Sequence, residues 1–88
     1  MEDEIRILLV DDEPLVRRSM EKTLIRAGME VETAAGALDG LARFTAALEA
    51  APFNLAVVDL HMPDLRGVDN PDAGLELLSE LLARQPAL

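Results

Sequence analysis

The fold is decided by the stretch IRILLVDDEP, residues 5–14. Its first six residues are a nearly continuous apolar run rich in branched side chains, which predicts a strand buried on both faces. The run ends at Asp11 and Asp12, and Pro14 then suits the first turn of a helix. A short buried strand that passes at once into a helix is typical of a parallel α/β sheet.

The next segment of the chain continues this alternation. Apolar residues at helical spacing predict a first helix over residues 14–27, which Gly28 ends. We expect Met20 to lie in the core and Lys22 to face water. Residues 30–34 alternate at period two and predict a second, shorter strand.

A second helix and a third strand–helix pair complete the pattern. Pro52 ends the second helix, residues 55–58 form an apolar strand, and a loop runs from residue 60 to about 68. Asn70-Pro71-Asp72 resembles the start of a third helix, with Asn70 as N-cap, that stops near Pro86. The predicted apolar faces of these two helices are Leu38, Leu41, Phe44 and Leu48, and then Leu75, Leu78 and Leu82.

Composition excludes several classes of function. The 88 residues carry a formal net charge of −9 and contain no cysteine. The net charge argues against a broad basic surface for nucleic acid or anionic membrane, and the lack of cysteine excludes disulfides and thiolate metal sites. The acidic start lacks a signal peptide, and no apolar run is long enough to span a bilayer. We expect a soluble, cytoplasmic protein that binds neither nucleic acid through this segment nor membrane.

Three carboxylates stand directly after predicted strands. Asp11 and Asp12 follow the first strand, and Asp59 follows the third. In open parallel sheets, ligands bind beyond the carboxyl ends of the strands. If the two strands are neighbours, the three side chains converge, and a cation would offset their mutual repulsion. Mg²⁺ is a hard cation that prefers such oxygen ligands, and a carboxylate beside it can attack phosphorus.

Each acidic segment has an ordinary explanation when it is taken alone. Acidic residues before a helix commonly cap it or interact with its dipole. A single aspartate after a strand is usually a turn residue. The joint placement of both segments on one sheet is what favours phosphoryl chemistry.

Two segments together resemble the hallmarks of response-regulator receiver domains. They are LLVDDEP at residues 8–14 and VVDLHMP at residues 57–63, and AGMEV at residues 27–31 is similar as well. The resemblance implies a flavodoxin-like, doubly wound α/β fold with parallel strands in the order 2-1-3-4-5. Residues 1–88 would form the N-terminal portion of one such domain, with its first three βα units and the strand order 2-1-3.

The resemblance also implies a role for each matching residue. Asp59 would be the phosphoacceptor, taking a phosphoryl group from a sensor histidine kinase or phosphotransfer protein, and would also contact Mg²⁺. Asp12 would be a direct metal ligand, and Asp11 would act through a metal-bound water. The backbone carbonyl of His61 would be a further ligand, while its side chain points towards solvent.

The sequence departs from the family pattern in two places. Residues 68–73 look like an acidic insertion after the third strand. The chain also ends at Leu88, where the fourth strand of the family should begin. The family's later threonine or serine, its lysine and its switch aromatic residue are therefore missing from these 88 residues. We expect an incomplete receiver domain with a possible output domain beyond Leu88.

Two other functions stay open. A truncated receiver could bind a kinase or another partner without being phosphorylated, as a decoy or interaction module. The chain could instead be a Mg²⁺-dependent phosphatase with an aspartate nucleophile. That class places a second aspartate two residues after the first, whereas Asp11 and Asp12 are adjacent, and the chain lacks a glycine-rich phosphate loop. The phosphatase is therefore the weaker alternative.

Overall fold

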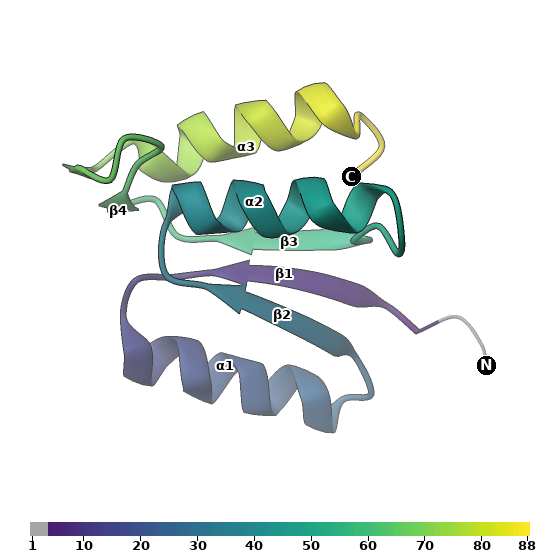
Figure 1. Ribbon diagram of the computed structural model, residues 1–88. Helices are drawn as coiled ribbons and strands as arrows, with labels where there is room; N and C mark the ends of the chain where they lie inside the picture. The colour runs from purple at the N-terminus through teal and green to yellow at the C-terminus, as the bar shows by residue number, and fades with distance from the viewer. Residues whose placement is uncertain (1–3) are drawn as a thin grey trace.

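The fold is a parallel β-sheet with helices on both faces. A computed structural model describes residues 4–88, with α1 against one face of the sheet and α2 and α3 on the other (Figure 1). The elements in chain order are β1 (Arg6–Val10), α1 (Pro14–Arg26), β2 (Glu30–Ala34), α2 (Ala37–Leu48), β3 (Leu55–Val58), β4 (Met62–Pro63), β5 (Asp69–Asn70) and α3 (Ala73–Arg84).

The three main strands are parallel and lie in the order β2-β1-β3, which confirms the predicted order. In register, Val10 at the end of β1 lies between Ala34 of β2 and Val58 of β3. Backbone hydrogen bonds continue past the strand ends. The Asp11 amide donates to the Ala34 carbonyl at 3.1 Å, and the Asp59 amide donates to the Val10 carbonyl at 2.9 Å. The sheet itself therefore sets where the acidic segments begin.

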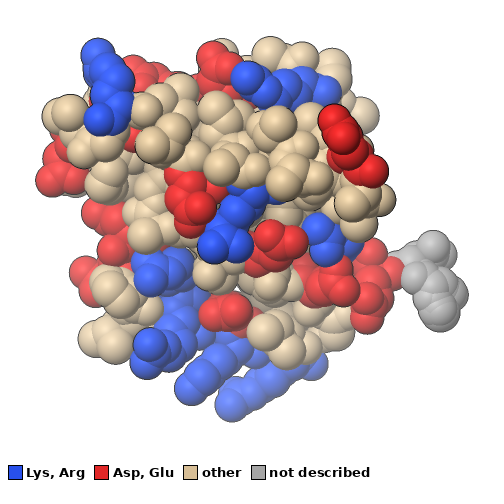
Figure 2. All heavy atoms as spheres, in the orientation of Figure 1, with Lys and Arg blue, Asp and Glu red and all other residues tan. Residues whose placement is uncertain are grey.

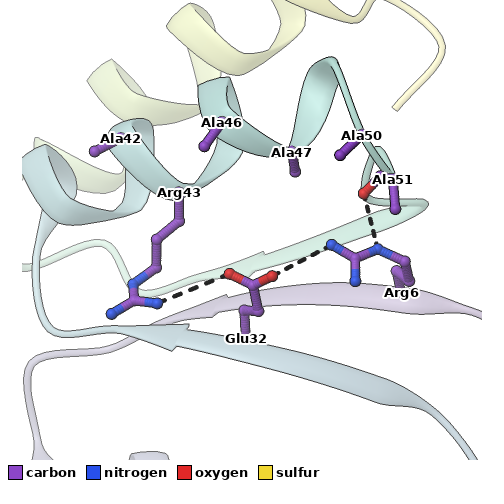
Figure 3. Close-up of a pocket in the computed structure, with 8 residues that line it drawn as sticks. All are labelled: Arg6, Glu32, Ala42, Arg43, Ala46, Ala47, Ala50 and Ala51. Carbon is purple, nitrogen blue, oxygen red and sulfur yellow. Dashed lines mark hydrogen bonds and ion pairs between the residues drawn. The ribbon is translucent and has the colours of Figure 1, made fainter.

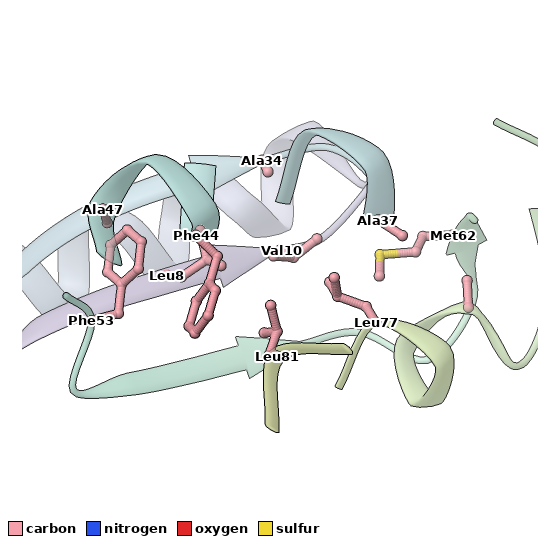
Figure 4. Close-up of a cluster of buried hydrophobic side chains, with 11 residues drawn as sticks. Leu8, Val10, Ala34, Ala37, Phe44, Ala47, Phe53, Met62, Leu77 and Leu81 are labelled. Atoms are coloured by element: carbon pink, nitrogen blue, oxygen red, sulfur yellow. The ribbon is translucent and has the colours of Figure 1, made fainter. Parts of the chain in front are cut away.

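The central strand β1 is buried on both faces, as its composition predicts. Residues Ile7 to Val10 are at most 1% exposed. Successive side chains of a strand point to opposite faces. Leu8 and Val10 belong to the hydrophobic cluster beneath α2 and α3, together with Phe44, Leu77 and others (Figure 4).

The predicted apolar faces of α2 and α3 are partly wrong. Leu38, Leu75, Leu78 and Leu82 are between 36% and 59% exposed. Both helices instead approach the sheet and each other through small residues with a few large ones between them. At Gly40, for example, a Cβ atom would lie 3.0 Å from the Val10 side chain. The buried residues are Ala37, Gly40, Phe44 and Ala47 in α2, and Ala73, Gly74, Leu77 and Leu81 in α3.

Helix α1 begins where predicted and ends one residue earlier, and it lacks the predicted core residue. It begins at Pro14, ends at Arg26, and is followed by Gly28 with φ of 92°. None of its residues is buried, and Met20 is only partly covered. The reason is that no other helix within residues 4–88 packs beside α1 on its face of the sheet. Lys22 faces water, as expected.

The segment expected to be a loop and an insertion forms a small hairpin. Strands β4 and β5 pair antiparallel, with Met62 opposite Asn70 and Pro63 opposite Asp69. Gly67 in the turn has φ of 81°, a conformation that favours glycine. Helix α3 begins at Ala73, so Asn70 is not its N-cap. The Asn70 side chain instead accepts a hydrogen bond from the Asp72 amide at 2.8 Å.

The surface carries intermixed charges with one basic region. In Figure 2 the Lys and Arg side chains gather at the bottom of the view, over α1. In the rest of this view acidic and basic side chains are intermixed. The net charge of the chain is −9. No helix within residues 4–88 is long and apolar enough to cross a membrane.

The register of α3 can be tested with two neighbouring leucines. Leu77 is fully buried, whereas Leu78 is 36% exposed. We expect Leu77→Ala to lower the free energy of unfolding by about 3 kcal/mol, because it leaves a cavity in the core. Leu78→Ala, the matched control, should cost about 1 kcal/mol or less. Urea unfolding followed by circular dichroism measures both, and equal losses would contradict this register.

Candidate metal centre

Three carboxylates meet at the carboxyl end of the sheet. One carboxylate oxygen from each of Asp11, Asp12 and Asp59 lies within 4.8 Å of the other two. Asp11 is half-buried, and Asp12 and Asp59 are exposed. These are the three residues that the sequence predicts to converge, and they do so because β1 and β3 are direct neighbours.

Backbone hydrogen bonds orient two of the three side chains. The Glu13 amide donates to Oδ1 of Asp11 at 2.9 Å, and the Leu60 amide donates to Oδ1 of Asp59 at 2.9 Å. Arg17 of α1 donates to the Asp11 backbone carbonyl at 2.8 Å. Sequence reasoning missed Arg17, because its role depends on how the first turn of α1 folds back over the strand end.

The donor set fits a hard divalent cation. All three side chains offer oxygen, and solvent reaches two of them, so water could complete the coordination of Mg²⁺. The side chain of His61 is exposed, as expected. The assignment of its backbone carbonyl as a ligand stays a prediction.

The start of helix α3 packs directly against the backbone of Asp59, the predicted phosphoacceptor. The Gly74 amide donates to the Leu60 carbonyl at 2.9 Å. A Cβ atom at residue 74 would lie 2.2 Å from the backbone oxygen of Asp59. Only glycine allows this approach. The sequence pattern gives no sign of this contact.

One buried charge lies in the hairpin that follows the site. Asp64 is 1% exposed and is the one charged residue that is buried within residues 4–88. Its carboxylate accepts hydrogen bonds from the side chains of Arg66 and Asn70 and from the amides of Arg66 and Val68. These bonds, with that of the Arg66 guanidinium first, hold the pKa of Asp64 well below its usual range, although burial opposes them.

A groove lies at the other end of the sheet. Its volume is about 530 Å³, and alanines of α2 line one side. Glu32 stands between Arg6 and Arg43, and both contacts are ion pairs (Figure 3). Hydrogen bonding to Glu30, more than to Glu32, raises the pKa of Arg6. Because these arginines already pair with carboxylates, the groove is a charged surface feature remote from Asp59.

Comparison with known proteins agrees with the fold. The family model described as the response regulator receiver domain matches residues 7–88. The chain belongs to this family. A nitrate/nitrite response regulator homolog from Haemophilus influenzae is 35% identical over 69 residues, which are 78% of this chain and 32% of that protein.

Solved receiver structures show the same architecture. A CheY-like receiver domain protein from Methanospirillum hungatei is 37% identical with a TM-score of 0.76, and the match covers 96% of this chain and 58% of that one. The response regulator TrrA from Thermotoga maritima, in complex with Mg²⁺ and BeF, is 29% identical with a TM-score of 0.76 over 93% of this chain and 62% of that one. TrrA has also been solved in complex with the histidine kinase ThkA, a match with a TM-score of 0.74 and 29% identity that covers 93% of this chain and 61% of that one. The receiver chain therefore spans less than two thirds of each relative.

The metal centre predicts a coupling between Mg²⁺ and stability. Mg²⁺ at ten times its Kd should raise the free energy of unfolding by about 1.4 kcal/mol. Asp12→Asn should abolish this increase and, without Mg²⁺, should stabilise the protein, because it removes one of three mutually repelling charges. Asp39→Asn on α2 is the control. Thermal unfolding with and without Mg²⁺ measures both effects, and an unchanged Mg²⁺ response in Asp12→Asn would rule out this ligand.

The lowered pKa of Asp64 predicts an acid-dependent contribution to stability. The unfolded carboxyl has a pKa of about 3.9. Because the folded pKa is lower, the ionised side chain stabilises the fold fully above that value, and the contribution is lost as the pH falls further. The difference in unfolding free energy between the wild type and Asp64→Asn should therefore be constant above about pH 5. It should shrink below pH 4.

The control for this pH dependence is Asp69→Asn in the same hairpin. The Asp69 side chain is exposed, so its removal should change stability little at any pH. Urea unfolding across the pH range gives both comparisons. A difference for Asp64→Asn that grows towards low pH would contradict the sign of the shift.

Proposed function

We propose that this receiver domain accepts a phosphoryl group on Asp59 from a sensor histidine kinase or phosphotransfer protein, with Mg²⁺ as cofactor. The observation that carries the proposal is the convergence of three carboxylates within 4.8 Å at the end of β1 and β3. The Mg²⁺ and BeF complex of TrrA supports it, since that relative has the same fold. Asp12 would bind the ion directly, Asp11 through water, and the His61 carbonyl would be a further ligand.

The proposed reaction needs an attacking oxygen on Asp59, a fixed orientation of its carboxylate, and positive charge beside it. One carboxylate oxygen attacks phosphorus, a new P–O bond forms, and the P–N bond of the donor phosphohistidine breaks, with its electron pair left on the imidazole nitrogen. The Leu60 amide holds Oδ1 of Asp59, which leaves Oδ2 as the attacking atom. Bound Mg²⁺ would supply positive charge that allows the anionic carboxylate and phosphoryl group to approach each other.

The surface beside the site fits a protein donor. Leu15 lies three positions after Asp12 and is 74% exposed. Arg18 and Lys22 on the same helix are also exposed, and basic side chains gather over α1 (Figure 2). An apolar side chain beside a basic helix suits a partner with apolar and acidic groups. We place the phosphodonor on this side of the molecule, in the cytoplasm.

An interaction module that binds a partner without phosphorylation is the second candidate. The exposed Leu15 and the basic side chains of α1 would serve such a partner whether or not Asp59 is phosphorylated. Partner binding that is unchanged in Asp59→Ala, with no detectable Mg²⁺ binding, would favour this second candidate over the first.

Phosphorylation of Asp59 can be tested by direct labelling. Incubation of the full chain with radiolabelled acetyl phosphate and Mg²⁺ should label the protein, and Asp59→Asn should remove the label because amide nitrogen and oxygen are poor nucleophiles. Asp39→Asn, which removes an exposed carboxylate of α2, should leave the label unchanged. Chelation of Mg²⁺ should also prevent labelling. Label that persists in Asp59→Asn would refute the assignment.

A further inference from the structure

The hairpin between β3 and α3 is organised around one buried carboxylate. We define the Asp64 cluster as the side chains of Asp64, Arg66 and Asn70. Oδ2 of Asp64 accepts from the Arg66 guanidinium at 2.8 Å and from the Asn70 amide at 3.1 Å. Oδ1 accepts from the backbone amides of Arg66 at 2.9 Å and Val68 at 3.1 Å. A carboxylate at 1% exposure with four donors is fully satisfied and therefore rigid.

The cluster joins the two strands of the hairpin on both sides of its turn. The Asp64 amide donates to the Val68 carbonyl at 2.8 Å, and Asn70 lies opposite Met62 in the ladder. Met62 is fully buried in the core beneath α2 and α3. The hairpin is thus fixed to the core at the strand that follows His61 directly.

The same cluster reaches the start of α3. Asn70 donates to Asp64 through its amide nitrogen and accepts from the Asp72 amide through its oxygen at 2.8 Å. Helix α3 begins at the next residue, and its Gly74 meets the backbone of Asp59 and Leu60. Contacts therefore run without a gap from the Asp64 carboxylate to the peptide that carries the proposed phosphoacceptor.

We propose that Asp64 is a positioning residue for the metal centre, because it fixes the hairpin and the start of α3 that together hold the Asp59 and His61 backbone in place. The inference rests on the proposed function of Asp59. It differs from a merely structural role, in which the Asp64 cluster would stabilise the hairpin and leave the affinity of the folded protein for Mg²⁺ unchanged. Groups that orient metal ligands typically change affinity by about 10- to 100-fold when they are removed.

The test is the Kd for Mg²⁺, measured by calorimetry on the full chain under conditions where circular dichroism shows each variant to be folded. We expect Asp64→Ala to weaken Mg²⁺ binding about tenfold. Asp69→Ala removes an exposed carboxylate from the same hairpin and serves as the matched control, with a change of about twofold or less, the size expected of a screened surface charge.

A double variant provides the rescue. Asp64→Asn combined with Asn70→Asp exchanges the amide and the carboxylate across their contact, so that a hydrogen bond between the two positions is retained. Because Arg66 and Asn70 both donate to Oδ2 of Asp64, the carboxylate at position 70 would also lie within reach of the Arg66 guanidinium. The Kd of this double variant should return to within about threefold of the wild type, since coupled neighbours are not additive. Arg66→Ala removes one of the four hydrogen-bond donors to the Asp64 carboxylate. Because the Arg66 side chain is 74% exposed, this variant should weaken Mg²⁺ binding less than Asp64→Ala does. This milder variant decides the question if Asp64→Ala does not fold.

The outcomes separate this inference from the proposed function. If the wild type binds no Mg²⁺, the proposed function fails. If the wild type binds and Asp59→Asn does not, while Asp64→Ala or Arg66→Ala binds as tightly as the wild type, only the positioning role is overturned. Equal losses of Mg²⁺ affinity in Asp64→Ala and Asp69→Ala would also overturn the positioning role. The loss would then come from the removal of one negative charge and not from the contacts of Asp64.

Discussion

The parallel pairing of β1 with β3 is the interaction on which the site depends. Val10 and Val58 are partners in that ladder, and the Asp59 amide donates to the Val10 carbonyl one position further on. Two acidic segments that are almost 50 residues apart in the chain are thereby brought to the same edge of the sheet. The convergence of these carboxylates is a consequence of strand order, since any other neighbour for β1 would separate them.

The packing on the α2 and α3 face keeps that edge in place. Gly40 lets α2 approach Val10, and Gly74 lets α3 approach the Asp59 peptide. Larger residues at either position would push a helix outwards and shift the strand ends with it. The hairpin between β3 and α3, whose strands are joined through Asp64, connects the site to the start of α3. The positions that make the site are thus held from the sheet below and from a helix above.

Much of this fold and site could be predicted from the sequence, and the failures have physical causes. Strand β1, the start of α1 and the carboxylate convergence followed from a buried apolar run and from acidic residues at strand ends. The faces of α2 and α3 did not, because leucines lie beside the buried face of each helix as well as near its centre, and close approach at small residues such as Gly40 determines which side is buried.

The hairpin and the exposure of α1 were missed for other reasons. Two-residue strands carry almost no periodic signal, and the burial of Asp64 depends on partners that fold around it. Met20 has the spacing of a core residue, yet its cover depends on elements that lie beside α1, which the spacing within one helix does not report. Local patterns therefore predict elements well, and contacts between elements decide burial.

The proposed metal centre joins the three carboxylates in one divalent-cation site. Mn²⁺ is a paramagnetic substitute for Mg²⁺ that broadens the NMR signals of nearby nuclei, and a substoichiometric titration would locate the bound ion. We expect the amide signals of residues 10–12 and 59–61 to broaden first and together. Broadening that begins at the acidic residues Glu30 and Glu32, while the Asp12 and Asp59 amides stay sharp, would contradict it.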